Sequence, residues 1–159
     1  MHKQKVYLET TMFNYYFDTT KNAQPATVAF FKAIRIGQFE GYTSVYTYKE
    51  LDRAPEPQRT NMLNLIDKYN IEVLDTSDEV LQLANNYITN NVIPKKKKLD
   101  ALHIAVASAN ELDIILSYNF KHINKLKTKI LVPATNLIFG YRNIVIAQPE
   151  EVIDFETDD

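Results

Sequence analysis

Four polar side chains, far apart in the sequence, lie where a predicted strand or helix begins or ends. Glu9 and Asn119 each follow a short apolar run that is typical of a buried strand. Glu50 lies on the helix predicted after another strand, and Asp100 begins a segment that is apolar nearly all round. Because open α/β sheets bind ligands along the carboxyl edge of their strands, we expect these four side chains to meet there.

Three carboxylates and one amide at one sheet edge predict a site for a hard divalent cation. Carboxylates held a few ångströms apart raise one another's pKa unless a cation joins them. Oxygen ligands suit Mg²⁺ or Mn²⁺ rather than zinc, and the chain has no cysteine, which excludes a thiolate metal site and a disulfide framework. Such an ion activates water and neutralises charge on a phosphoryl group, so the predicted reaction is phosphodiester hydrolysis.

Each acid also has a purely structural interpretation, which the sequence leaves open. Glu9 and Glu50, taken singly, fit solvated acids near a helix end. Asp100 fits a cap at the start of its helix, although an acid beside so apolar a segment calls for a reason.

Strands and helices alternate along almost the whole chain, which predicts an α/β fold with a mainly parallel sheet. Strands are expected at 5–8, 41–45, 71–74, 113–117, 130–132 and 144–146. Helices are expected at 25–36, 57–69, 100–112 and 134–141, and a capping-box pattern at 76–79 predicts the start of one more.

Length and composition predict one soluble domain spanning 1–159, with 155–159 as a frayed tail. The net charge of −2 argues against a wholly basic nucleic-acid-coating protein but allows a local basic face. The sequence shows no apolar signal segment and no run long enough to span a membrane, so a cytoplasmic protein is expected. Only three glycines occur, without a glycine-rich phosphate loop, which argues against a nucleotide-binding domain.

Three segments, taken in order, resemble the PIN-domain family of metal-dependent ribonucleases. They are VYLETTMFNYYF, SVYTYKELDRA and, most specifically, LDALHIAVASANELDIILSYNFKHI. The resemblance implies a three-layer α/β/α sandwich and endonucleolytic cleavage of RNA by a metal-activated water. Many members are homodimers and toxins that a protein antitoxin silences, so a homodimer and an antitoxin partner are expected.

The resemblance also implies roles for individual residues. Glu9, Glu50 and Asp100 fall at the positions of the family's first three acids, and Asn119 falls at the fourth, which is Asp or Asn. These four residues would be the catalytic metal ligands, for Mg²⁺ or Mn²⁺. Thr11 and Ser117 match small hydroxyl positions that support the site.

One departure from the family pattern concerns Glu9, because the first acid is usually Asp. The side chain is one methylene longer, and a displaced ligand can cost considerable rate. A non-catalytic PIN-like module that binds RNA or protein is therefore the alternative function. Since Asn119 is neutral, the site carries three formal charges, which favours one tightly held ion.

Several basic residues flank these positions. His103 lies three residues after Asp100 on the same helical face, where it either contacts the scissile phosphate or packs beside the site. Other cations that either contact RNA phosphates or are merely solvated are Lys96, Lys97, Lys98, Lys121 and His122.

Overall fold

The structure, a computed structural model, describes residues 2–153, so the predicted tail at 155–159 lies outside the described residues. The strands are β1 (Gln4–Leu8), β2 (Phe39–Ser44), β3 (Glu72–Leu74), β4 (Ile114–Leu116) and β5 (Val145–Ala147). The α-helices are α1 (Thr10–Phe17), α2 (Gln24–Arg35), α3 (Val45–Asp52), α4 (Gln58–Lys68), α5 (Asp78–Thr89), α6 (Lys98–Ala109) and α7 (Leu126–Ile138). In the same described range, the short 3-10 helices are η1 (Lys95–Lys97) and η2 (Pro149–Glu151). Within the described range, no helix has the length and apolar character needed to cross a lipid bilayer.

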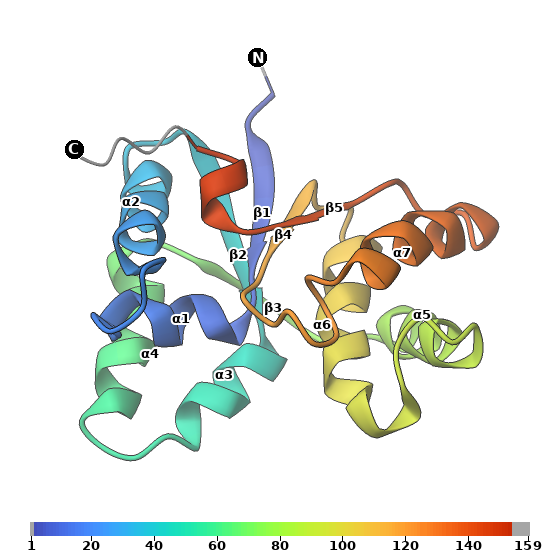
Figure 1. Cartoon of the computed structure of the whole chain (residues 1–159), viewed down its shortest axis with the longest axis horizontal. Coiled ribbons are helices and arrows are strands. Elements are labelled where there is room, and N and C mark those ends of the chain that lie inside the picture. Colours follow the sequence, from blue (N-terminus) through green and yellow to red (C-terminus); the bar gives the residue numbers. More distant parts are fainter. Residues whose placement is uncertain (1, 154–159) are drawn as a thin grey trace.

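All the strand pairs are parallel, and β1 lies in the middle of the sheet order β3-β2-β1-β4-β5 (Figure 1). Val6 of β1 pairs with Gly41 of β2 on one side and with Ile114 of β4 on the other. The chain first builds outward through β2 and β3 and then returns to the opposite side with β4 and β5. The direction of winding therefore reverses between β1 and β4, the kind of place where open α/β sheets bind ligands.

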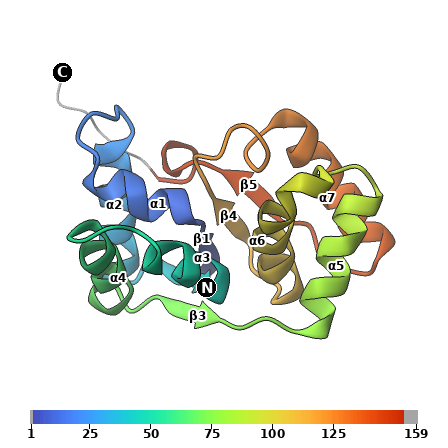
Figure 2. The ribbon, with the colours of Figure 1, turned by 90° about the horizontal axis from the view of Figure 1, so that it is seen from below.

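Alternate side chains of the central strands face two different helical layers. Val6 and Leu8 pack in one buried cluster with residues of α1, α2 and α4, whereas Tyr7 and Ile115 pack in another with α5 and α6. Figures 1 and 2 show α1, α2 and α4 on one side of the sheet and α5, α6 and α7 on the other. The predicted three-layer α/β/α sandwich with a parallel sheet is confirmed.

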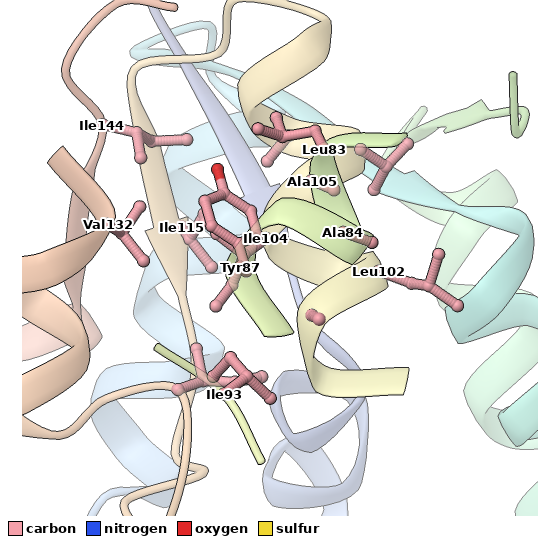
Figure 3. Close-up of a cluster of buried hydrophobic side chains, with 14 of the residues drawn as sticks. Leu83, Ala84, Tyr87, Ile93, Leu102, Ile104, Ala105, Ile115, Val132 and Ile144 are labelled. Carbon is pink, nitrogen blue, oxygen red and sulfur yellow. The ribbon is translucent and has the colours of Figure 1, made fainter. Parts of the chain in front are cut away.

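Helix α6 is buried on nearly all sides, as its composition predicts. Every residue from Ala101 to Ser108 is buried, and Ile104 has no exposed surface. In the cluster drawn in Figure 3, α6 packs between α5, which carries Tyr87, and strand β4, which carries Ile115. Because the helix is apolar all round, it can be stable only inside the molecule, and this burial holds the first turn of α6 at the sheet edge.

The local signals for the starts of α2 and α5 are confirmed. Ser77 caps α5 by accepting a hydrogen bond from the backbone N–H of Val80 at 3.1 Å. Pro25 lies in the first turn of α2, where its missing N–H costs nothing.

The strand expected at 130–132 is wrong, because these residues lie inside α7. The helix expected at 134–141 correspondingly begins at Leu126 and ends at Ile138. A short apolar run does not by itself distinguish a strand from a helix that packs on the core. In α7, Val132 is fully buried while Ile130 is 60% exposed, and the place beside β4 is taken by β5.

Candidate functional site

Glu9 leaves the end of β1 and turns the chain into α1. It is the N-cap of that helix, and its backbone N–H donates to the carbonyl of Leu116 at 3.1 Å, which ties the end of β1 to β4. The side chain is only 4% exposed. A carboxylate that is this deeply placed needs hydrogen-bond donors around it.

Both hydroxyl residues expected to support the site bind Glu9. The Oγ1 of Thr11 and the Oγ of Ser117 each donate to Glu9 Oε1 at 2.6 Å, and the backbone N–H of Thr11 donates to the same oxygen at 3.3 Å. Burial raises the pKa of Glu9, and the opposing influence of His103 and of these hydrogen bonds does not cancel it. In the absence of a cation, the charged form of Glu9 is therefore less favourable here than in water.

Glu50 projects from α3 and is only half-buried. Its Oε1 accepts hydrogen bonds from Thr10 Oγ1 and from His103 Nε2, both at 2.7 Å. Burial tends to raise the pKa of Glu50, but the hydrogen bonds from His103 and Thr10 outweigh it and hold the pKa below its ordinary value. Glu50 is therefore the acid that is best stabilised as a carboxylate.

Asp100 and Asn119 form the third part of the site. Asp100 lies in the first turn of α6, whose N-cap is Lys97, so the capping interpretation of Asp100 is wrong. The Nδ2 of Asn119 donates to Asp100 Oδ1 at 3.2 Å, and Asn119 Oδ1 accepts from the backbone N–H of His122 at 3.1 Å. Burial raises the pKa of Asp100, although His103, His122 and Lys97 oppose this.

Ser117 connects these groups to one another. Its Oγ donates to Glu9 and also accepts from the backbone N–H of Asn119 at 2.9 Å. Thr11 makes the same kind of connection, because its Oγ1 donates to Glu9 and accepts from the backbone N–H of Tyr118 at 2.8 Å. One hydrogen-bonded chain thus runs from Glu9 through Ser117 and Asn119 to Asp100.

The three carboxylates share one pattern of hydrogen bonding. Each of Glu9, Glu50 and Asp100 accepts its side-chain bonds on a single oxygen, and within residues 2–153 no hydrogen bond engages the other. Carboxylate oxygens of this kind are the donors that Mg²⁺ and Mn²⁺ prefer, so the chemistry of the donor set fits such an ion. Among the described residues, however, no three acidic or histidine side chains converge closely enough to hold one cation.

His103 lies behind Glu50, away from solvent. It is 1% exposed, with Nε2 on Glu50 and Nδ1 2.6 Å from the hydroxyl of Tyr7. Of the two interpretations of this histidine, packing beside the site agrees with its burial, because a phosphate contact requires access to solvent. Tyr7 and Thr10 are not among the site residues predicted from the sequence. A tyrosine in the middle of a buried strand needs a polar partner, and that rule identifies Tyr7 as a candidate.

The flanking cations differ in their relation to the site. Lys97 and His122 lie close enough to Asp100 to lower its pKa. The side chains of Lys96, Lys98 and Lys121 are exposed, and in the described part of the chain none of them forms an ion pair with a predicted site residue. A positively charged border is therefore present next to Asp100.

Comparisons with known proteins identify the fold. No protein-family model matches the chain, and no curated protein matches it by sequence. Among solved structures it is similar to the Mycobacterium tuberculosis VapC20, a toxin that cleaves the sarcin–ricin loop, with a TM-score of 0.52 and 9% identity over 75% of this chain and 93% of that one. It is also similar to VapBC2 from Rickettsia felis, bound to a DNA fragment from their promoter, with a TM-score of 0.53 and 13% identity over 78% of this chain and 95% of that one. The chain has the fold of the PIN-domain toxins.

Proposed function

We propose that the protein is a Mg²⁺- or Mn²⁺-dependent endoribonuclease that hydrolyses RNA phosphodiester bonds. The observation that carries this proposal is the set of three carboxylates at the carboxyl edge of a PIN fold, each with one oxygen anchored by hydrogen bonds and one left over. The likeness to VapC20, described as a toxin that cleaves the sarcin–ricin loop, supports RNA as the substrate class.

In this proposal the residues divide into ligands and supports. Glu9, Glu50, Asp100 and Asn119 would hold the ion, which when bound supplies an activated water and neutralises charge on the phosphate. Thr11 and Ser117 hold Glu9 in place through their hydroxyls. Because buried, raised-pKa carboxylates resist ionisation without a counter-ion, Glu9 and Asp100 gain most from a bound cation.

The test is RNA cleavage by the purified full chain with and without Mn²⁺. We expect cleavage with Mn²⁺, none with EDTA, and none in the variant Asp100→Asn, which keeps the shape of the side chain but removes its charge. Asp67→Asn is the matched control, because Asp67 is exposed on α4. Cleavage that survives EDTA, or that persists in Asp100→Asn at the level of Asp67→Asn, would overturn the proposal.

The toxin role and the expected partners belong to the same proposal. Expression of the chain alone should arrest growth of a bacterial host, and Asp100→Asn should relieve the arrest. An antitoxin protein and a second copy of the chain are the proposed partners. Co-purification with the product of a neighbouring gene tests the antitoxin, and sedimentation of the purified chain tests the homodimer.

A non-catalytic PIN-like module that binds RNA or protein is the second candidate. Two observations favour it: the longer Glu9 stands where Asp is usual, and within residues 2–153 no three acids converge on one point. This candidate predicts no heat of binding when Mn²⁺ is titrated into the protein, and an RNA affinity that is unchanged in Asp100→Asn. Saturable Mn²⁺ binding that Asp100→Asn abolishes excludes it.

A further inference from the structure

We propose that Tyr7 is a positioning residue of this site: its hydroxyl holds the imidazole of His103 in the one tautomer that donates to Glu50. Within residues 2–153 no hydrogen bond joins the Tyr7 side chain to a predicted ligand, so Tyr7 would act through His103. The effect on catalysis rests on the proposed function, but the hydrogen-bond order itself does not.

The geometry of Tyr7 leaves its hydroxyl little freedom. The side chain belongs to the central strand β1 and has no exposed surface. Its hydroxyl lies 2.7 Å from Ser44 Oγ, at the end of β2, and 2.6 Å from His103 Nδ1, on α6. Hydrogen bonds therefore join β1, β2 and α6 at this one buried hydroxyl, and they hold β1 and α6 together.

The direction of each hydrogen bond follows from what each atom can do. A carboxylate only accepts, so His103 Nε2 must carry the proton that is shared with Glu50 Oε1 at 2.7 Å. In a neutral ring Nδ1 is then bare and accepts from the Tyr7 hydroxyl, and the Ser44 hydroxyl donates to the Tyr7 oxygen. Ser44 Oγ in turn accepts from the backbone N–H of Tyr46 at 3.2 Å. With these directions, every hydroxyl and ring nitrogen of the hydrogen-bonded series has a partner. This agrees with the absence of unsatisfied buried side-chain N and O atoms in the described range.

The consequence for Glu50 is a fixed carboxylate plane. His103 Nε2 and Thr10 Oγ1 approach the same oxygen, Oε1, from two elements. That leaves Oε2 oriented as the oxygen for a cation. If the Tyr7 hydroxyl is removed, the imidazole can flip or change tautomer, and Glu50 loses one of its two anchors. Loss of a residue that hydrogen-bonds directly to a metal ligand, as His103 does to Glu50, typically changes metal affinity or activity by about 10- to 100-fold. Because Tyr7 acts through His103, this range is the upper limit for removal of its hydroxyl.

The first experiment needs no activity and no substitution in Tyr7. The chain has three histidines, so the ring nitrogens give a simple long-range ¹H–¹⁵N spectrum, and His103→Gln identifies the signals of His103. In metal-free protein at pH 8 we expect His103 to show a protonated Nε2 and a bare Nδ1. A proton on Nδ1, in either a singly or a doubly protonated ring, would overturn the inference.

The second experiment compares Tyr7→Phe with Tyr87→Phe. Tyr87 is a matched control because it is also fully buried in the same cluster (Figure 3). Its hydroxyl bonds Ser108 and Asn136, neither of which is a predicted site residue. In Tyr7→Phe we expect a mixture of His103 tautomers, Mn²⁺ binding weaker by about 10-fold, and a kcat lower by about 10-fold with little change in KM for RNA. Tyr87→Phe should match the wild type in all of these readouts.

The outcomes separate the inference from the function it rests on. If the wild type neither binds Mn²⁺ nor cleaves RNA, the proposed function fails, and the tautomer spectrum alone decides the role of Tyr7. If the wild type is active and Tyr7→Phe has the same His103 tautomer, Mn²⁺ affinity and kcat as Tyr87→Phe, the inference fails and the proposed function stands. Should Tyr7→Phe not fold, the wild-type spectrum still supports or overturns the proposed tautomer.

Discussion

Replacing Glu9 by glutamine should stabilise the metal-free protein at neutral and basic pH. Glu9 is 4% exposed and its pKa is raised by burial, so its ionised form is disfavoured in the folded chain. A glutamine side chain has the same shape, and its amide oxygen could accept the same three hydrogen bonds from Thr11 and Ser117. The amide loses the charge assistance of those bonds but avoids burying a charge.

The size and the pH dependence of this effect follow from the raised pKa. When the pKa of a group is higher in the folded than in the unfolded state, the group contributes its full stability below the unfolded-state pKa. This contribution is lost as pH rises through the folded-state pKa. Glu9→Gln should therefore gain nothing well below pH 4.5, the ordinary value, and gain most above the raised pKa. We expect a gain on the order of 1 kcal/mol at pH 8, which for a chain of this size raises Tm by about 3 °C.

The assay is thermal unfolding followed by circular dichroism in EDTA, at pH 8 and at pH 4. Glu72→Gln, at an exposed carboxylate of β3, is the control and should change the free energy of unfolding by less than about 0.5 kcal/mol at both pH values. Added Mn²⁺ should reverse the ranking, because only the wild type would bind it. A lower Tm for Glu9→Gln at pH 8, or the same offset at both pH values, would refute the reasoning.

Three further substitutions test the fold. Ile104→Ala removes a fully buried side chain of α6 and should lower the free energy of unfolding by about 2–5 kcal/mol, measured by urea denaturation with an unchanged m-value. Gly41→Ala places a Cβ only 2.7 Å from the Cδ1 of Ile71 and should cost about 1–3 kcal/mol in the same assay. Ser77→Ala removes the cap that accepts the N–H of Val80 and should cost about 1 kcal/mol, visible as a lower Tm.

Much of the frame that positions the site could be predicted from local patterns. The strand ending at Leu8 and the strand ending at Leu116 are short apolar runs followed by polar residues, and parallel pairing necessarily brings such ends to one edge. Helix α6 could be predicted because a segment that is apolar all round has no alternative to burial. The pattern failed at Ile130, where three apolar residues fit a strand and a packed helix equally well.

The inner arrangement of the site depends on facts that spacing does not contain. Sequence positions predict that Glu9, Glu50 and Asp100 share an edge, but not which oxygen of each is already engaged. The partnership of Tyr7 with His103 arises because alternate residues of β1 face opposite layers, and only the packing decides which helix stands opposite. Which side chains become hydrogen-bond partners thus depends on how the helices and strands pack in the folded protein.

The central place of β1 has a consequence for synthesis of the chain on the ribosome. β1 is made before the other four strands of the sheet, yet Glu9 and its partner Ser117 are separated by 108 residues. A nascent chain that has released only β1, β2 and β3 carries two of the acids without the strand that joins them to Asn119. Because Asp100, Ser117 and Asn119 follow β3 in the chain, the site can close only after β4 has left the ribosome. A product that terminates before β4 would therefore lack Ser117 and Asn119 and could not assemble the site.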